Sequence, residues 1–181
     1  MTFADARAEL ETLSAVRLHE MTWQAPDELE FAVCAVDRPP ASELVQSMRQ
    51  EMAEIYDGLD IDNAEMPRAG AAELGPPGGL FLVGFRDGSP ICCGGIKRLP
   101  DGACEFKRMF VVQDARHRGV ARALLGELER RALQLGYEVA RLDTGPRQDR
   151  AQRMYERAGY RPVSNFNANP LASFFGEKRL S

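Results

Sequence analysis

Residues 114–132 read DARHRGVARALLGELERRA and place a group of basic side chains around Gly119, just before a helix. These side chains are Arg116, His117, Arg118 and Arg122. From Ala121 to Leu135 apolar residues recur at helical spacing, and Gly136 is a typical helix end. Free backbone N–H groups and the positive end of the helix dipole make a helix start a binding site for phosphate. Because Gly119 has no Cβ to block the main chain, the segment predicts a site for an anionic ligand.

The charged residues of the 181-residue chain are divided unevenly. Residues 1–75 hold 16 acidic and 5 basic side chains, whereas residues 76–181 hold 11 acidic and 18 basic ones. The basic half lacks the dense Lys/Arg runs with interleaved aromatic residues that nucleic-acid surfaces carry. No apolar run approaches the roughly 18 residues of a membrane span. We therefore expect a small anionic ligand, and neither a nucleic-acid nor a membrane partner.

The length suits one domain. We expect an N-terminal extension over residues 1–25, either a loose helix or disordered, and a single domain over residues 26–181. The first ten residues, MTFADARAEL, carry acids where a secretory signal has a basic and then an apolar region, which predicts a cytoplasmic protein. The four cysteines form no C-x-x-C motif and are expected to be buried, reduced thiols. The two histidines, His19 and His117, are far apart, so no metal site is predicted.

Hydrophobic patterning predicts an α/β fold with a sheet of mixed direction. Ser42 is expected to cap a helix that runs to about Tyr56, and a turn at Asp87 and Gly88 is expected to join two antiparallel strands. In chain order the expected elements are a strand over residues 28–37, the Ser42 helix, a loop over 58–79, strands over 79–85, 90–99 and 103–112, the helix of the opening segment, a strand over 137–144, a helix over 149–158, and strands over 160–166 and 172–180.

The chain contains no G-x-x-x-x-G-K-[ST] or G-x-S-x-G motif, and no G-x-G-x-x-G follows a strand. Instead, RHRGVA at residues 116–121 resembles the [RQ]-x-x-G-x-[GA] motif of the GNAT acetyltransferase superfamily, which holds the diphosphate of acetyl-coenzyme A. The strand residues MFV at 109–111 stand at the family's usual distance before it. The family's later motif, N-x-x-A-x-x-x-Y-x-x-x-G-[FY], is matched by Gln148, Ala151, Tyr155, Gly159 and Tyr160, with Gln148 in place of the usual asparagine.

This resemblance covers residues 80–181 and implies a GNAT-like acyl-CoA N-acyltransferase fold, with a mostly antiparallel central sheet flanked by helices. It implies acetyl-coenzyme A as co-substrate and no metal. Backbone N–H groups near residues 109–111, where the family commonly carries a β-bulge, would bind the pantetheine arm and polarise the thioester carbonyl. The implied coenzyme-binding residues are Met109, Phe110, Val111, Arg116, His117, Arg118, Gly119, Val120, Ala121, Arg122 and Gln148. The alternative is a solvated helix start whose cations pair with Asp114.

The implied reaction is acetyl transfer from a thioester to an amine, by direct attack in a ternary complex. A protonated amine must lose a proton, and the departing thiolate must gain one. Glu105 is the candidate base, acting directly or through water; its structural alternative is an ion pair with Lys107 on the same strand face. Tyr155 is the candidate general acid, with a core aromatic as the alternative. Cys104 has no neighbouring base and is expected to be a packed thiol.

The predicted acceptor is a primary amine of a small molecule. Residues 51–73 carry seven acidic side chains and one basic one, Arg68, which would attract a cationic polyamine or aminoglycoside unless they form a solvated surface. Lys107 and Arg108 would instead bind a carboxylate, favouring an amino acid or a peptide end. A non-catalytic coenzyme sensor or regulatory module, and acetylation of a protein or peptide amine, are alternative functions. The sequence leaves the oligomeric state open, with a homodimer as one arrangement.

Overall fold

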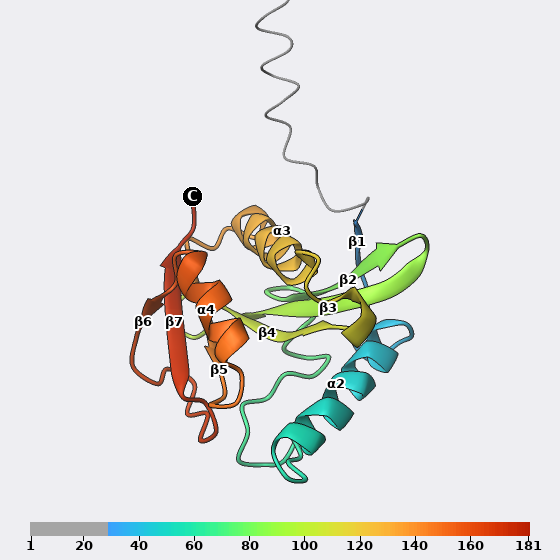
Figure 1. The fold of residues 1–181 in the computed structure, drawn as a ribbon. Helices are drawn as coiled ribbons and strands as arrows, with labels where there is room; N and C mark the ends of the chain where they lie inside the picture. The colour runs from blue at the N-terminus through green and yellow to red at the C-terminus, as the bar shows by residue number, and fades with distance from the viewer. Residues whose placement is uncertain (1–28) are drawn as a thin grey trace, which may run out of the picture.

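The computed structural model describes residues 29–181, which form a seven-stranded sheet with helices on both faces (Figure 1). The extension predicted for residues 1–25 lies outside the described residues. The element order is the predicted one, and the α/β class is confirmed. In chain order the elements are β1 (Glu30–Val33), α2 (Ala41–Ile55), β2 (Leu80–Arg86), β3 (Ser89–Arg98), β4 (Cys104–Val111), a 3₁₀ turn (Gln113–Ala115), α3 (Val120–Gln134), β5 (Val139–Thr144), α4 (Asp149–Arg157), β6 (Arg161–Pro162) and β7 (Phe174–Arg179).

The sheet has the order β1-β2-β3-β4-β5-β7-β6, and all neighbours are antiparallel except β4 and β5. These two parallel strands pair only where Cys104 and Glu105 lie opposite Ala140 and Arg141. Beyond Glu105 they separate, so the rest of β4 has no strand beside it on that edge among residues 29–181. A mostly antiparallel sheet is thus confirmed, with an opening at its centre.

A β-bulge lies in β4 beside this opening. Phe110 is opposite Cys93, whereas Lys107 is opposite Gly95, so β4 contains one more residue than β3 in this interval. Arg108 has a φ of 58°, which is rare for a residue with a side chain. The bulge that the family resemblance implies near residues 109–111 is therefore present.

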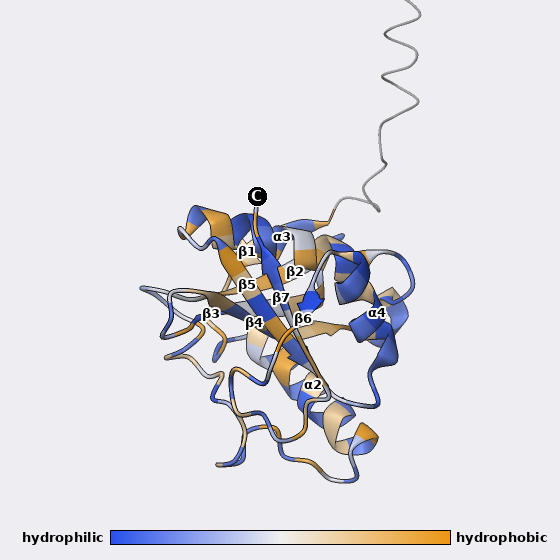
Figure 2. Ribbon diagram, turned by 90° about the vertical axis from the view of Figure 1, so that its left-hand side faces the viewer, coloured by the Kyte–Doolittle hydropathy of each residue, from blue (hydrophilic) through white to orange (hydrophobic). Residues whose placement is uncertain are grey.

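Apolar side chains pack on both faces of the sheet. Leu124, Leu125 and Leu128 of α3 pack in the core on one face. On the other face Val45 and Met48 of α2 share a cluster with β2 and β3. Helix α4 lies near β7 and is hydrophilic along most of its length (Figure 2).

Two details of the sequence prediction are wrong. Helix α2 begins at Ala41 after Pro40, and no side chain caps it, so Ser42 is not the cap. The fixed φ of proline favours a helix start at this point. The strand predicted over residues 160–166 is only two residues long, because Pro162 has no N–H for a sheet. The chain then turns at Asn165 and Asn167, whose side-chain oxygens accept hydrogen bonds from backbone N–H groups two residues later.

All four cysteines are free, and three of them are buried. Burial raises the pKa of the Cys104 thiol to about 12, which keeps it protonated and unreactive. Within residues 29–181 there is no group of three or more acidic, cysteine or histidine side chains that could hold a metal ion. The helices in this part of the chain are too short or too polar to cross a bilayer.

Gly79 is expected to be essential for packing the long loop against β3. A Cβ at this position would lie 2.4 Å from the carbonyl oxygen of Glu73 and 2.6 Å from that of Ile96. Gly79→Ala should therefore lower the free energy of unfolding by about 1–3 kcal/mol, measured by urea denaturation. Gly126→Ala is the control, because a Cβ there meets nothing within 4 Å, and it should be neutral or stabilising. A Gly79→Ala protein as stable as the wild type would contradict this interpretation.

Candidate active site

The start of α3 presents backbone N–H groups that have no acceptor. Gly119 occupies the N-cap position with a φ of 79°, and His117 has a φ of 63°. Within residues 29–181, the N–H groups of residues 117–122 donate no hydrogen bond to the backbone or to a side chain. Alternation of positive and negative φ values turns successive N–H groups into an anion-binding concavity. Together with the helix dipole, this arrangement is suited to bind an anion, and a phosphate site here stays a prediction of the sequence.

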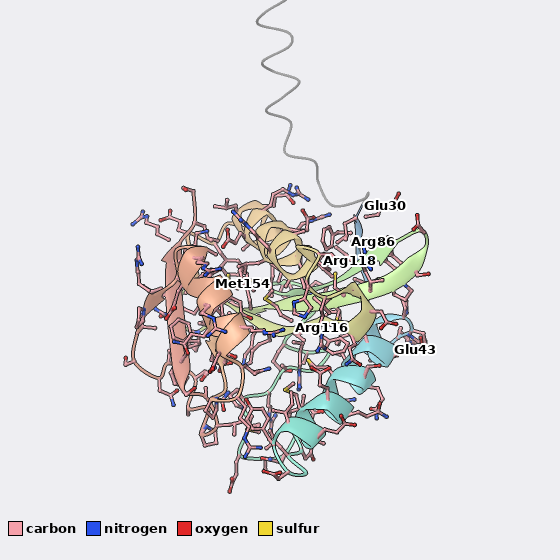
Figure 3. All side chains as sticks on the ribbon, in the orientation of Figure 1. Glu30, Glu43, Arg86, Arg116, Arg118 and Met154 are labelled. Atoms are coloured by element: carbon pink, nitrogen blue, oxygen red, sulfur yellow. The ribbon has the colours of Figure 1, made fainter. Side chains whose placement is uncertain are left out.

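Unpaired arginines surround this helix start. Arg118 lies at the N-terminal end of α3 in Figure 3, opposite Met154 of α4. A cavity of about 330 Å³ between the two helices is lined by Arg122, Arg150, Arg153 and Arg157. Among residues 29–181 none of these five arginines contacts a carboxylate. The ion pairs with Asp114 that a solvated helix start would require are therefore absent from this part of the chain.

His117 and Arg116 make contacts within the protein. Nη1 of Arg150 lies 3.1 Å from Nε2 of His117. Arg116 donates from Nε to the Val111 carbonyl at 2.9 Å and from Nη2 to Glu51 at 2.5 Å. The side chain of Arg116 therefore joins the end of β4 to α2 and supports the loop that carries the free N–H groups.

A cleft of about 960 Å³ opens where β4 and β5 separate, and α2, α3 and α4 contribute to its walls. The predicted site residues that line it are Lys107, Arg108, Met109, Phe110, Val111, Arg116, His117, Ala121, Gln148 and Tyr155. Glu105, Arg118, Gly119 and Val120 do not line it, and Arg122 lines the smaller cavity. The cleft thus joins the phosphate site at α3 to the bulge of β4.

Tyr155 lies on α4 and is 6% exposed at the wall of the cleft. Its hydroxyl donates a hydrogen bond to Sδ of Met109 at 3.7 Å. Burial raises the pKa of Tyr155 well above its usual value, and the negative charge of Asp143 raises it further. The phenol is therefore protonated at neutral pH and is chemically suited to donate a proton.

Gln148 precedes α4, and the protein binds both ends of its amide. Its Oε1 accepts a hydrogen bond from the Thr144 hydroxyl at 2.9 Å, and its Nε2 donates to Sδ of Met52 at 3.7 Å. The side chain thus connects the end of β5 with α2 at the wall of the cleft.

A buried polar cluster, which we define as Glu105, Lys107, Asp143, Asn167 and Asn169, lies beside the cleft. Nζ of Lys107 is 3.0 Å from Oε1 of Glu105 and 3.2 Å from Oδ2 of Asp143. The amides of Asn167 and Asn169 also donate to Asp143. The Glu105–Lys107 ion pair, the structural alternative for Glu105, is therefore present. Glu105 is fully buried, whereas Asp143 lines the cleft.

Arg108 lies at the bulge of β4 and lines the cleft. Its side chain is 8% exposed and forms an ion pair with Asp62 of the long loop through Nη2. Its Nε is buried and has no hydrogen-bond partner within residues 29–181. Burial lowers the pKa of Arg108, and Asp62 opposes this effect; a guanidinium nevertheless stays charged in proteins.

Sequence reasoning missed Asp143, Asn167 and Asn169 as site residues, and it grouped Glu51 and Asp62 with the acidic segment of residues 51–73 without identifying their partners. Two signals could have found the first three: Asp143 lies at the end of a central strand, and asparagines recur at alternate positions in residues 165–169. Glu51 and Asp62 carry no local signal, because each is defined by a partner distant in the chain.

Comparison with known proteins shows to which family the chain that forms this cleft is similar. The model of the acetyltransferase (GNAT) family matches residues 43–160. An IAA acetyltransferase of Azospirillum brasilense is 35% identical over 111 residues, which cover 59% of this chain and 72% of that protein. A GNAT-family acetyltransferase structure from Staphylococcus aureus is 17% identical, with a TM-score of 0.68, and the match covers 85% of this chain and all of that one.

The structure of an N-acetyltransferase from Thermoplasma acidophilum in complex with coenzyme A is 15% identical, with a TM-score of 0.60. The match covers 84% of this chain and 99% of that one. These structural neighbours share the fold, and the family match includes β4, α3, β5 and α4, the elements that build the cleft. The chain therefore belongs to the acetyltransferase (GNAT) family.

Proposed function

We propose that this protein transfers the acetyl group of acetyl-coenzyme A to a primary amine of a small molecule, by direct attack in a ternary complex. The observation that carries the proposal is one continuous cleft. It borders the acceptor-free N–H groups at the start of α3, the open edge of β4, and the protonated phenol of Tyr155. The cleft thus offers a phosphate site, a strand edge for an extended arm, and a proton donor. These match the three parts of a thioester donor: its diphosphate, its pantetheine arm and its sulfur.

The donor would bind along this path. We expect the N–H groups of residues 117–122 to hold its diphosphate, and the unpaired arginines of α3 and α4 to add charge-assisted contacts. The pantetheine arm would lie against the open edge of β4 in the manner of an added strand. The complex of the Thermoplasma neighbour with coenzyme A supports this choice of donor.

In the transfer, the amine nitrogen forms a bond to the thioester carbon and the carbon–sulfur bond breaks. Tyr155 would then give its proton to the departing sulfur, which lies near Met109 in this arrangement. The proton that the amine loses requires a carboxylate. Glu105 is the base that the sequence predicts, but it is fully buried beside Lys107 and would act through Lys107 or water; Asp143 is a second candidate that lines the cleft and could act directly.

Comparison of Glu105→Gln with Asp143→Asn separates these two bases. We expect Asp143→Asn to lower kcat/KM by about 100-fold or more, the usual contribution of a general base, without changing the affinity for acetyl-coenzyme A. Glu105→Gln should lower the rate less if Glu105 acts through Lys107 or water. Asp101→Asn is the control, because this exposed carboxylate pairs with Arg141 outside the cleft. Full activity in both cluster variants would show that neither carboxylate is the base.

Thiol release from acetyl-coenzyme A across a panel of amines tests the proposed function itself. We expect turnover with at least one small primary amine and a product heavier by one acetyl group. Tight binding of the coenzyme with no turnover on any amine would instead favour a sensor or regulatory module.

A further inference from the structure

Three of the seven acidic side chains of residues 51–73 form ion pairs within the protein. Glu51 pairs with Arg116, Asp57 with Arg147, and Asp62 with both Arg49 and Arg108. Of the seven acids in this segment, Glu51 alone lines the cleft. Because Glu51 is paired with Arg116 and the other six do not line the cleft, the segment offers little free negative charge to a cationic acceptor inside it.

Of the two adjacent cations of β4 that line the cleft, Lys107 and Arg108, the one with the less complete ion pairing is Arg108. Lys107 is balanced because Glu105 and Asp143 lie within 3.2 Å of its Nζ. Around Arg108, in contrast, Asp62 is the one carboxylate of residues 29–181 within ion-pair distance, and it is shared with the guanidinium of Arg49; Asp60 also attracts Arg108 but forms no ion pair with it. The positive charge of Arg108 at the wall of the cleft thus has no carboxylate of its own among residues 29–181.

The guanidinium of Arg108 also retains an unused donor. Its side chain is more than nine-tenths buried, and Nε lacks a partner. A buried charged donor without an acceptor is costly, and a carboxylate is the group that best matches a guanidinium. The bulge at Arg108 places this side chain and that of Lys107, adjacent in sequence, at the wall of the same cleft.

The position of Arg108 relative to Tyr155 limits the shape of the acceptor. Arg108 is adjacent in sequence to Met109, whose sulfur contacts the Tyr155 hydroxyl. Because Arg108, Met109 and Tyr155 all line the same cleft, an amine two bonds from a carboxylate held by Arg108 would lie in the cleft that contains the proposed proton donor. The walls of the cleft also carry apolar side chains, which include Met48, Met52, Ile55, Ile61, Met66 and Leu171.

We propose that the acceptor is an amine that carries a carboxylate beside its nitrogen and an apolar side chain, such as a large apolar α-amino acid, and that Arg108 binds this carboxylate. The inference rests on the proposed acetyl transfer and specifies its substrate class. Asp62 then competes with the acceptor's carboxylate for Arg108. Arg108 would therefore favour the binding of that carboxylate, and Asp62 would oppose it.

Matched acceptor pairs test this proposal by kcat/KM with acetyl-coenzyme A. The pairs are leucine with isoamylamine, and phenylalanine with phenethylamine and phenylalaninamide; spermidine represents the cationic class. We expect the wild type to prefer the carboxylate member by about 10- to 100-fold, the usual value of one charge-assisted hydrogen-bond pair. Preferred turnover of spermidine or of the carboxylate-free amines would overturn this inference and leave acetyl transfer intact. Turnover of no amine would overturn the proposed function and this inference with it.

Two variants with opposite expected effects exclude a purely structural role of the ion pair. Arg108→Gln should remove the preference for the carboxylate member, whereas Asp62→Asn should increase it by freeing the guanidinium. Arg68→Gln, an exposed arginine on the same loop outside the cleft, is the control and should keep the wild-type ratio. If Arg108→Gln fails to fold, the ratio of kcat/KM between the carboxylate acceptor and its carboxylate-free partner in Asp62→Asn alone tests the proposal. A ratio that falls or stays unchanged in Asp62→Asn would contradict the proposal.

Discussion

Replacement of Gly119 with glutamate is expected to abolish the binding of acetyl-coenzyme A and to leave the fold intact. The new carboxylate would lie among the N–H groups of residues 117–122, where the diphosphate is expected, and would repel it. Loss of two charge-assisted hydrogen bonds of about 1.5–3 kcal/mol each corresponds to a 10²- to 10⁴-fold weaker complex. Calorimetric titration of the coenzyme into the folded variant measures the change.

Two control variants at other glycines separate the effect of the added charge in Gly119→Glu from the effect of backbone strain. Gly126→Glu adds the same charge two turns further along α3, where a Cβ meets nothing within 4 Å. Gly102→Glu adds it at a φ of 88°, in a turn remote from the cleft. Both variants should bind the coenzyme as the wild type does. Unchanged affinity in Gly119→Glu would show that the start of α3 does not hold the diphosphate.

Tyr155→Phe is expected to lower kcat by about 100-fold or more and to leave the affinity for acetyl-coenzyme A unchanged. The variant keeps the ring that packs against Tyr160 and removes only the proton donor. Because burial raises the pKa of Tyr155, the wild-type phenol stays protonated at neutral and mildly alkaline pH. The rate should therefore not fall with rising pH in this range through loss of this acid. Steady-state rates and the pH profile of kcat give both quantities.

Tyr160→Phe is the matched control for Tyr155→Phe. Tyr160 is a buried tyrosine in contact with the same ring, and it does not line the cleft. The control variant should keep the wild-type kcat. Equal rate losses in the two variants would indicate a packing effect and would contradict the role of Tyr155 as the acid.

Features that depend on neighbouring residues could be predicted from the sequence. The turn at Asp87 and Gly88 forms as expected, and both residues have positive φ values. The helix after Gly119 ends at Gly136, whose φ is 88°. In each case a glycine adopts a positive φ, which costs other residues steric energy. The local sequence therefore determines the structure at these two positions.

Features that depend on distant partners could not be predicted. Arg116 was expected to bind an anion, but its side chain pairs with Glu51, which is 65 residues away. Arg108 of β4 pairs with Asp62 of the long loop, which is 46 residues away in the sequence. These contacts arise when the chain folds, and no periodicity or motif encodes them. The short length of β6, in contrast, has a local cause that the sequence analysis did not use, because Pro162 within this strand has no N–H for the sheet.

A crystal structure with bound acetyl-coenzyme A tests the central claim most directly. We predict diphosphate oxygens within hydrogen-bond distance of the N–H groups of residues 117–122, and a pantetheine arm beside β4 beyond Glu105 that ends near Tyr155. A diphosphate bound elsewhere, with those N–H groups still without an acceptor, would contradict this account of the site.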